Sequence, residues 1–276
     1  MDTQLKSKLQ QQALTIRKDV VTQVFRAQSG HPGGSLSIAD IMAYLYFVEM
    51  NIDPKNPKWT ERDRFVLSKG HTCPALYSCL AHNGFFDPEE LKSFRHLGAM
   101  LQGHPDMNKI PGVDMSSGSL GQGISAAVGM ALAGKIDNKN YRVYTVLGDG
   151  EIEEGQVWEA AMFAAHYKLD NLCAIVDSNG LQIDGAVKDV LSPHPIDAKF
   201  ESFGFHVIVA DGHDFDAIEA AFEEAKTVTG KPTAIIFNTI KGKDVSFMEN
   251  QAGWHGKAPG EELYNQAMAD LSALEA

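Results

Sequence analysis

Near its middle the chain reads Val143-Tyr144-Thr145-Val146-Leu147-Gly148-Asp149-Gly150, an apolar, β-rich run that ends in a carboxylate between two glycines. After a helical segment comes a second such run, Ala174-Ile175-Val176-Asp177-Ser178-Asn179-Gly180, which ends in an amide. Two such runs around a helix predict a strand–helix–strand crossover between parallel strands. We therefore expect Asp149 and Asn179 at the carboxyl ends of neighbouring strands.

This pair of side chains suits a site for a divalent cation and a phosphate group. The Asp149 carboxylate and the Asn179 amide oxygen are hard donors of the kind that Mg²⁺ or Ca²⁺ prefers. Gly150 can turn its N–H toward a phosphate oxygen because no Cβ stands in the way. Gly-Asp-Gly alone fits ordinary turn residues of an α/β crossover equally well, so its meaning depends on the rest of the chain.

The rest of the chain repeats the alternation of strands and helices. Periodicity and breaker residues predict strands at 64–68, 143–147, 172–177, 205–210 and 232–239. They predict helices at 4–27, 74–80, 120–134, 157–168, 214–228 and 261–274, and a helix start at Pro88. We expect a doubly wound α/β fold, with a parallel sheet flanked by helices, in a single domain over residues 1–276.

Two local patterns refine this prediction. The breaker cluster Ser29-Gly30-His31-Pro32-Gly33-Gly34 ends the first helix, and Ser37-Ile38-Ala39-Asp40 indicates a capped start of the next, running through Val48. The segment from Leu120 to Gly134 is rich in Gly, Ala and Ser. Such a helix lets other backbones approach closely, so we expect it to be buried in the middle of the protein.

Composition excludes several classes of function. A net charge of −12 argues against a nucleic-acid partner, because binding of the phosphate backbone depends on a basic surface. No apolar run reaches the roughly 18 to 20 residues of a membrane span, and the amino terminus lacks the apolar core of a signal peptide. We expect a cytoplasmic protein without membrane contact. Cys73, Cys79 and Cys173 are too few and too scattered for disulfides or zinc, which predicts buried, reduced thiols.

Six ordered motifs resemble those of the transketolase family, from about residue 10 to about residue 260. The first is the Gly148-Asp149-Gly150 … Asn179 pair, which resembles the thiamine diphosphate fingerprint. The others are Ser29-Gly30-His31-Pro32-Gly33-Gly34, Ser68-Lys69-Gly70-His71, Gly103-His104-Pro105, Gly118-Ser119-Leu120-Gly121-Gln122-Gly123 and Trp254-His255-Gly256-Lys257-Ala258-Pro259.

The resemblance implies a thiamine diphosphate site with Mg²⁺ or Ca²⁺. It adds the main-chain carbonyl of Leu181 to Asp149 and Asn179 as a metal ligand. It places Gly118, Ser119 and Leu120 against the aminopyrimidine and thiazolium ends of the cofactor, with Ser119 where many relatives have proline. Besides these, the cofactor-binding residues are those of the Gly-Asp-Gly loop and its surroundings, namely Gly148, Asp149, Gly150, Glu151, Glu154, Asn179 and Leu181, together with His71 and His255.

Four histidines fall in the matched motifs and are the candidate catalytic residues. By resemblance His71 reaches the diphosphate, and His255 lies between the diphosphate and the bound sugar. His31 and His104 line the donor channel and hydrogen-bond sugar hydroxyls. Imidazole suits this role because it donates, accepts and exchanges protons near neutral pH. The other histidines are expected to be surface or structural: His82, His96, His166, His194, His206 and His213.

The charged residues around these motifs have several interpretations. Glu151, Glu153 and Glu154 at a helix start can complement the helix dipole. By resemblance Glu154 lies at a subunit interface and couples two cofactors, whereas Glu151 and Glu153 are expected to stay solvated. Lys241 and Lys243 can assist an anionic ligand, although relatives use this run mainly structurally.

The resemblance also indicates that this chain supplies half of an active site. Activation of the cofactor needs a carboxylic acid at its ring N1′, and in transketolases this glutamate comes from a following pyrimidine-binding domain. We expect either the amino-terminal subunit of a two-chain α2β2 transketolase, with a carboxyl-terminal partner, or a fragment of a longer chain, and favour the first. The alternatives are a subunit of another thiamine diphosphate enzyme, of the 2-oxo-acid dehydrogenase or deoxyxylulose-phosphate synthase type, and a non-catalytic binding subunit.

Overall fold

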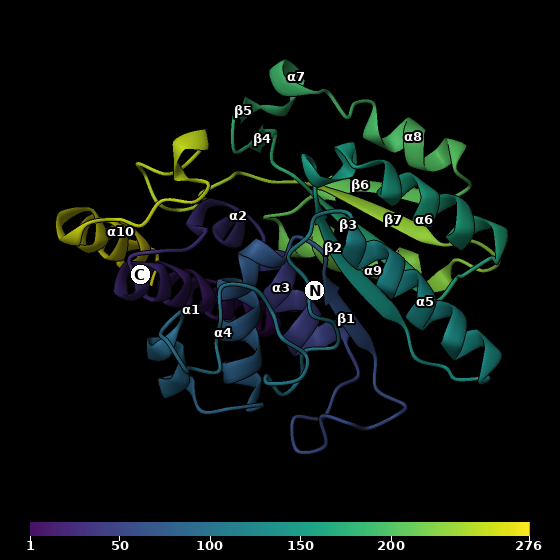
Figure 1. Ribbon diagram of the computed structural model, residues 1–276, viewed down its shortest axis with the longest axis horizontal. Coiled ribbons are helices and arrows are strands. Elements are labelled where there is room, and N and C mark those ends of the chain that lie inside the picture. Colours follow the sequence, from purple (N-terminus) through teal and green to yellow (C-terminus); the bar gives the residue numbers. More distant parts are fainter. Residues whose placement is uncertain (276) are drawn as a thin grey trace.

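A five-stranded parallel sheet forms the centre of the protein (Figure 1), which is described by a computed structural model over residues 1–275. Its strand order is β1-β2-β3-β7-β6. The strands are β1 (Arg64–Leu67), β2 (Val143–Gly148), β3 (Leu172–Ser178), β7 (Thr233–Asn238) and β6 (His206–Asp211). The predicted crossover is confirmed, because β2 and β3 pair in parallel with Gly148 opposite Asp177.

Helices cover both faces of this sheet, as Figure 1 shows. On one side of the sheet lie α1 (Thr3–Ala27), α2 (Pro32–Ser37), α3 (Ala39–Tyr44), α4 (Cys73–Asn83) and α9 (Phe215–Thr227), and α10 (Glu261–Ser272) packs against α1. The other side carries α5 (Gln122–Ile136), α6 (Gly155–His166) and α8 (Ile196–Ser202). This arrangement confirms the predicted doubly wound α/β fold.

The strands are apolar throughout because both of their faces are buried. Along β2, Tyr144 and Val146 join the core beneath α1 to α4, whereas Val143 and Leu147 join the core beneath α5 and α6. Residues of a strand alternate between faces, so one continuous apolar run serves two separate cores. The polar residues that follow each strand are therefore the first side chains free to form a site.

The region before β1 departs from the prediction. The cluster at 29–34 is not simply a loop, because α2 begins at Pro32, a favoured first helical residue with its fixed φ. The predicted cap at Ser37 is wrong: Ile38 occupies the N-cap position of α3, and the Ser37 hydroxyl donates instead to Asp177 Oδ2 at 2.7 Å. The helix then runs on as a π-helical turn, Leu45–Glu49.

Several short elements were not predicted from the sequence. The antiparallel pair β4 (Leu181–Gln182) and β5 (Gly185–Ala186) and the helix α7 (Val187–Val190) follow β3, before α8. The 3₁₀ segments Gly70–Thr72, Glu151–Glu153 and Ala252–Trp254 were not predicted either, whereas Pro88–Ser93 lies where a helix start was expected and Ala273–Glu275 continues α10. These elements are too short to give a periodic pattern.

For the glycine-rich helix α5, the predicted close approach of another backbone is confirmed, but the predicted burial is not. A Cβ at Gly123 would lie 2.6 Å from Ser68 Cα, so only glycine lets α5 lie against the chain that leaves β1. The expectation that α5 is buried in the middle of the protein is wrong. Gly129 faces open space and Ile136 is exposed, because α5 covers one outer face of the sheet rather than threading between two layers.

The cysteines and the helices bear on two smaller predictions. Cys73, Cys79 and Cys173 are free and buried, as predicted. Burial raises the pKa of each thiol above its usual value, which favours the uncharged thiol form. Within residues 1–275, none of the helices combines the length and the apolar character that crossing a bilayer requires.

Candidate cofactor site

A cavity of about 270 Å³ opens at the carboxyl ends of β1, β2, β3 and β7. Asp149 follows β2 directly and Asn179 follows β3, so the crossover brings both to this cavity as predicted. The remaining lining residues come from segments far apart in the chain: His31, Gly34, Lys69, His71, Gly118, Leu120, Gly148, Gly150, Glu151, Leu181, Gln182, Ile183, Lys241 and His255.

Asp149 is a buried carboxylate that the surrounding backbone holds in place. It is 1% exposed, its Oδ1 accepts from the Gly150 N–H at 2.9 Å, and its Oδ2 accepts from the Gly180 N–H at 2.5 Å. Burial, with the nearby Asp177 carboxylate, raises the pKa of Asp149 to about 6. Such a carboxylate gains from a cation placed beside it.

Beneath the cavity lies a buried ion pair between Lys69 and Asp177. The Lys69 ammonium donates to Asp177 Oδ2 at 2.5 Å, and Asn179 Nδ2 donates to the same oxygen at 2.8 Å. Thr239 Oγ1 donates to Asp177 Oδ1. Burial would raise the pKa of Asp177, but Lys69 and these donors outweigh it and lower the pKa below its usual value. The pair fixes the orientation of Asn179 at the cavity wall.

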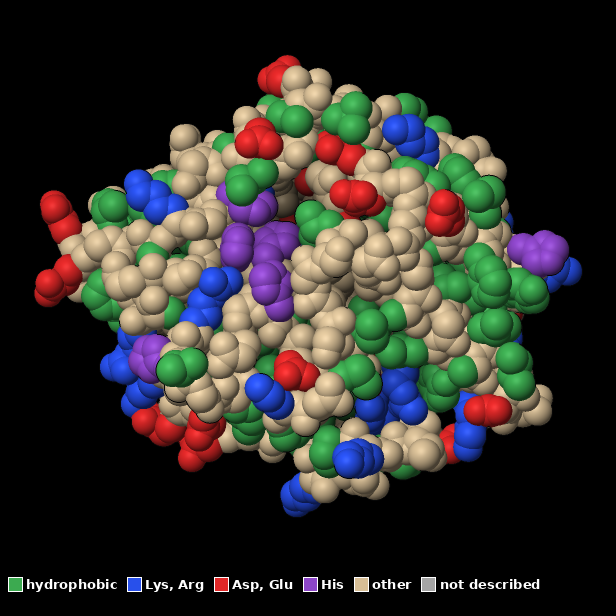
Figure 2. Space-filling view, in the orientation of Figure 1, with side chains coloured by type: hydrophobic (Ala, Val, Ile, Leu, Met, Phe, Trp, Pro, Cys, Tyr) green, Lys and Arg blue, Asp and Glu red, His purple; other side chains and the backbone are tan. Residues whose placement is uncertain are grey.

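Three of the four candidate catalytic histidines meet at the cavity. Ring centroids are 5.1 Å apart for His31 and His71, 5.1 Å for His71 and His255, and 5.5 Å for His31 and His255. Figure 2 shows histidine side chains gathered around a hollow on this face of the molecule. Within the part of the chain that the structure describes, the buried His31 Nδ1 has no hydrogen-bond partner. This nitrogen keeps a hydrogen-bonding capacity that the described protein groups do not satisfy.

The environment keeps these imidazoles neutral. Burial lowers the pKa of His31 to about 4, with the positive charge of Arg95 as the next cause. Burial and the Lys241 ammonium lower the pKa of His255 to about 3. Burial, Lys69 and the other imidazoles also lower the pKa of His71 well below its usual value. At neutral pH each ring can thus donate from one nitrogen and accept at the other.

The lowered histidine pKa values predict acid sensitivity. Groups with a depressed folded-state pKa stabilise the fold above the unfolded value of 6.5, and this stabilisation is lost as the pH falls. Asp149 acts oppositely, because its raised pKa favours the fold as the pH drops through about 6. Allowing for the partial solvent exposure of His31 and His255, we expect a net loss on the order of 1 to 2 kcal/mol between pH 6.5 and 5.

Urea unfolding at a series of pH values measures this effect. The His255→Asn variant should show a flatter profile than the unsubstituted chain over this range, whereas a variant at the exposed His166 should not. Parallel profiles for the unsubstituted chain and His255→Asn would contradict the expectation.

Other predicted residues lie outside the cavity wall. His104 is exposed, and its ring lies about 3 Å from the place where a Cβ on Gly118 would stand, with Cδ2 at 3.1 Å. Ser119 is exposed beside the lining residues Gly118 and Leu120. Glu154 is an exposed N-cap residue of α6. His104, Ser119 and Glu154 therefore surround the site without lining the cavity of this chain.

Glu151 contradicts the expectation that it stays solvated. It is 3% exposed, and its carboxylate accepts from the Ser68 hydroxyl at 2.5 Å and from the backbone N–H groups of Gly121 at 2.9 Å and Gly148 at 3.0 Å. These three donors, two of them from distant segments of the chain, replace the water that a surface glutamate would bind. Glu151 thus ties the Gly-Asp-Gly loop to the start of α5.

No role was predicted for Lys69 and only a minor one for Lys241, although both lysines line the cavity. Lys69 stands within a matched motif, but nothing in the sequence places its ammonium on Asp177. Lys241 is 3% exposed, and its ammonium lies 2.8 Å from the Leu181 carbonyl oxygen and 3.0 Å from His255 Nδ1. Burial, and then the charge of Lys69, lower the pKa of Lys241 to about 8. The Lys241 ammonium contributes positive charge where an anionic ligand would lie.

The cavity fits a diphosphate carried by a divalent cation. Four lining glycines expose bare backbone to it: Gly34, Gly118, Gly148 and Gly150. Among residues 1–275, no group of three or more His, Cys, Asp or Glu side chains is placed to hold a metal. A metal here would draw on the oxygens of Asp149, Asn179 and Leu181, the donor type that Mg²⁺ or Ca²⁺ prefers. The Leu181 carbonyl accepts from Lys241 and keeps a second lone pair for a cation.

Known proteins resemble this chain along nearly its full length. The family described as "Transketolase, thiamine diphosphate binding domain" matches residues 9–272. The 6-deoxy-6-sulfo-D-fructose transketolase subunit SqwG of Clostridium sp. (strain MSTE9) is 50% identical over 95% of this chain and 96% of its own length. An apulose-4-phosphate transketolase subunit from Phocaeicola vulgatus is 42% identical over 93% of this chain and 91% of its own length.

The fold agrees with these relatives. A solved transketolase from Campylobacter jejuni superposes with a TM-score of 0.92 at 38% identity, covering 99% of this chain. The chain spans 43% of the length of that solved protein. With the site geometry above, these findings show that the chain belongs to the transketolase family of enzymes and carries that family's thiamine diphosphate-binding domain.

Proposed function

We propose that this chain is the diphosphate-binding subunit of a two-chain transketolase. With thiamine diphosphate and Mg²⁺ or Ca²⁺, the enzyme transfers a two-carbon ketol unit from a ketose phosphate to an aldose acceptor. The observation that carries this proposal is the convergence of three neutral histidines, two lysines and the Asp149–Asn179 pair on one cavity. Asp149, Asn179 and the Leu181 carbonyl hold the metal, and the glycine backbone and Lys241 face the diphosphate.

The histidines supply the acid–base groups of the reaction. Thiamine diphosphate, when bound, supplies a nucleophilic thiazolium carbon for ketol transfer. His31 and His255 stand next to the cavity as neutral imidazoles, able to donate to an oxyanion and to accept a hydroxyl proton in turn. His71 follows Lys69 by two residues, and its ring lies 5.1 Å from each of the other two rings; by the family resemblance it reaches the diphosphate. His104 and Glu154 act at the edge of the site, where a second chain completes it.

A carboxyl-terminal partner chain supplies the other half of the site. The two carboxylates that line the cavity are already engaged, since Asp149 faces the metal site and Glu151 accepts from three protein donors. Neither is free to act on the cofactor's ring N1′. Two relatives that this chain covers almost completely are named as subunits, whereas the Campylobacter transketolase is more than twice as long. An α2β2 assembly places a pyrimidine-binding domain over each cavity.

The donor sugar has a second candidate. The SqwG relative is named for 6-deoxy-6-sulfo-D-fructose, a ketose that carries a sulfonate where common donors carry a phosphate. At 50% identity this relative is more similar than the apulose-4-phosphate subunit at 42%. Both donor types carry a terminal anion. Assays with fructose 6-phosphate, xylulose 5-phosphate and 6-deoxy-6-sulfo-D-fructose distinguish the two.

Activity should depend on the partner chain. We expect the purified chain to show no measurable ketol transfer alone, because the group that activates the cofactor lies on the partner. Adding a chain of roughly 300 residues with a pyrimidine-binding domain should restore turnover. The release of an aldose from a ketose phosphate, followed in a coupled assay, measures this. Robust turnover by the single chain would overturn the two-chain proposal.

The same assay separates the remaining alternatives. A 2-oxo-acid dehydrogenase or deoxyxylulose-phosphate synthase subunit would react with pyruvate rather than with a ketose phosphate. A non-catalytic binding subunit would bind thiamine diphosphate without turnover under any pairing. The family match and the three clustered histidines favour the transketolase.

A further inference from the structure

The segment that follows β7 delivers three groups to the cofactor site. Thr239 Oγ1 donates to Asp177, the Lys241 ammonium reaches the Leu181 carbonyl and His255, and the Gly242 N–H donates to the Gly33 carbonyl at 2.9 Å. The positions of these groups depend on the course of the backbone between Thr239 and Gly242. Within that stretch the Ile240 N–H points away from the site.

His213 holds the Ile240 N–H. The Ile240 N–H donates to His213 Nε2 at 2.9 Å. Because a backbone N–H can only donate, His213 Nε2 must be the unprotonated nitrogen, and Nδ1 carries the proton. His213 Nδ1 then donates to Asp40 Oδ2 at 2.7 Å. The imidazole therefore bridges the chain after β7 and a carboxylate on α3.

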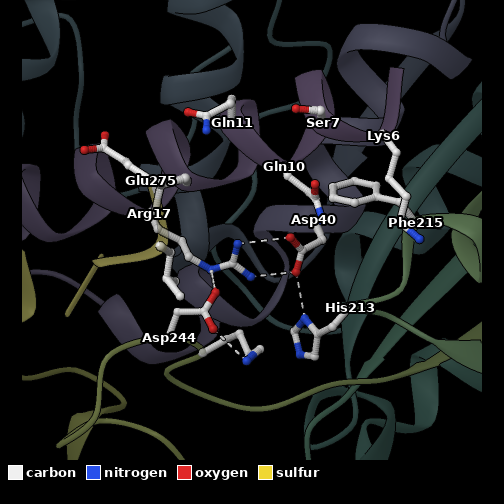
Figure 3. Close-up of a pocket in the computed structure, with 13 residues that line it drawn as sticks. Lys6, Ser7, Gln10, Gln11, Arg17, Asp40, His213, Phe215, Asp244 and Glu275 are labelled. Atoms are coloured by element: carbon white, nitrogen blue, oxygen red, sulfur yellow. Dashed lines mark hydrogen bonds and ion pairs between the residues drawn. The ribbon is translucent and has the colours of Figure 1, made fainter. Parts of the chain in front are cut away.

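Asp40 is in turn anchored from α1. Arg17 donates from Nη1 to Asp40 Oδ1 at 3.0 Å and from Nη2 to Asp40 Oδ2 at 2.6 Å. Burial alone would raise the pKa of Asp40. Arg17 and the hydrogen bond from His213 have the larger effect and lower this pKa to about 2, so the carboxylate stays charged. Figure 3 shows Asp40 between Arg17 and His213, with Asp244 on the other side of Arg17. These residues line a separate cavity of about 610 Å³.

Asp40 also lies close to the other side of the cofactor site. It stands in the first turn of α3, three residues after Ser37, whose hydroxyl donates to Asp177. The preceding helix α2 carries Gly33 and Gly34, and the Gly34 carbonyl accepts from Lys69 at 3.1 Å. The path Asp40–His213–Ile240 thus joins the two segments that approach Asp177 from either side.

We propose that His213, held by Asp40, is a positioning residue of the cofactor site, which sets Lys241 and Thr239 through the Ile240 backbone. The inference rests on the proposed function, because it assigns these groups to diphosphate binding. His206, at the other end of β6, provides the contrast. Its Nε2 lies 2.7 Å from Glu224 Oε1, and within residues 1–275 no side-chain hydrogen bond joins it to the site.

Two substitutions each keep one of the two hydrogen bonds of His213 and remove the other. In His213→Gln the side-chain oxygen can reach the place of Nε2 and accept from Ile240. In His213→Asn the amide can take the place of Nδ1 and donate to Asp40, but the Ile240 N–H loses its acceptor. We expect hydrogen exchange of the Ile240 amide to be about tenfold faster or more in His213→Asn, and close to wild type in His213→Gln.

A second experiment tests whether His213 affects cofactor binding. Calorimetry measures the binding of thiamine diphosphate with Mg²⁺ to the chain in complex with its partner. We expect His213→Asn to weaken binding about tenfold and His213→Gln to restore most of the affinity. The double variant His213→Asn/Lys241→Met should lose clearly less affinity than the sum of the two single losses, because His213 acts in part through Lys241. His206→Asn, the matched control, should leave exchange and binding unchanged.

These measurements distinguish a positioning role of His213 from a general destabilisation of the fold by its substitution. Equal effects of His213→Asn and His213→Gln, or additive losses with Lys241→Met, would overturn the positioning role. If the wild-type complex binds no thiamine diphosphate, the proposed function fails. The exchange rates across residues 239–242 then still show whether His213 orders this segment.

Discussion

Replacing Asp149 by Ala should abolish the metal-dependent binding of thiamine diphosphate, with a loss of affinity of about a hundredfold or more. Removing a residue that only orients a metal ligand typically weakens binding ten- to a hundredfold, so removing a ligand should have at least that effect. Asp149 is 1% exposed and is the one carboxylate expected to contact the cation directly. Calorimetric titration with thiamine diphosphate, with Mg²⁺ and with a chelator, measures the loss.

The control for this experiment must separate a lost ligand from a loosened loop. Asp149 also accepts from Gly150 and Gly180, so Asp149→Asn, which can keep an acceptor in place, should retain the fold and still lose most of the metal dependence. Asp184, an exposed carboxylate in the loop between β4 and β5, provides the matched alanine variant. If Asp149→Ala binds the cofactor as the wild type does, Asp149 is only a turn residue.

The second large effect concerns stability. Asp177→Ala should lower the free energy of unfolding by about 3 to 5 kcal/mol, because it leaves the Lys69 ammonium buried without its counter-ion. Lys69 is 2% exposed and Asp177 fully buried, so water cannot replace the lost partner. The double variant Lys69→Met/Asp177→Ala should recover part of this loss, since it removes the unpaired charge. Urea unfolding of the three proteins measures the difference.

The exposed pair Lys92–Glu89 provides the comparison. Both of its side chains are at least half exposed, and such pairs typically contribute about 0 to 1 kcal/mol. Glu89→Ala should therefore change the free energy of unfolding by less than about 1 kcal/mol. A similarly small change in Asp177→Ala would show that the buried pair is not a main stabilising contact of the fold.

The sequence alone allowed prediction of those site residues whose positions follow from neighbouring strands or from short motifs. A strand–helix–strand crossover places the ends of β2 and β3 together, so Asp149 and Asn179 could be located from their positions after two apolar runs. The histidine motifs could be assigned through their resemblance to a family. Three of those histidines meet at the cavity, and the fourth, His104, lies beside it.

Long-range partners could not be read in the same way. Lys69 follows β1 and reaches Asp177 at the end of β3, across the end of β2, where a Cβ on Gly148 would lie 3.6 Å from Lys69 Cδ. That contact depends on the order of the strands in the sheet, which has no periodic signature in the sequence. Glu151 was misjudged for the same reason, because two of its three donors, Ser68 and Gly121, come from distant segments of the chain.

The scattered origin of the cavity wall also affects when the cofactor can assist folding. The lining residues extend from His31 to His255, and contacts such as Gly242 to Gly33 join opposite ends of the chain. During synthesis the site cannot exist until nearly the whole domain has emerged and its sheet has closed, because non-local contacts form only after their loops close. Thiamine diphosphate can therefore bind only after the chain has folded, and cannot act as a template for its early folding.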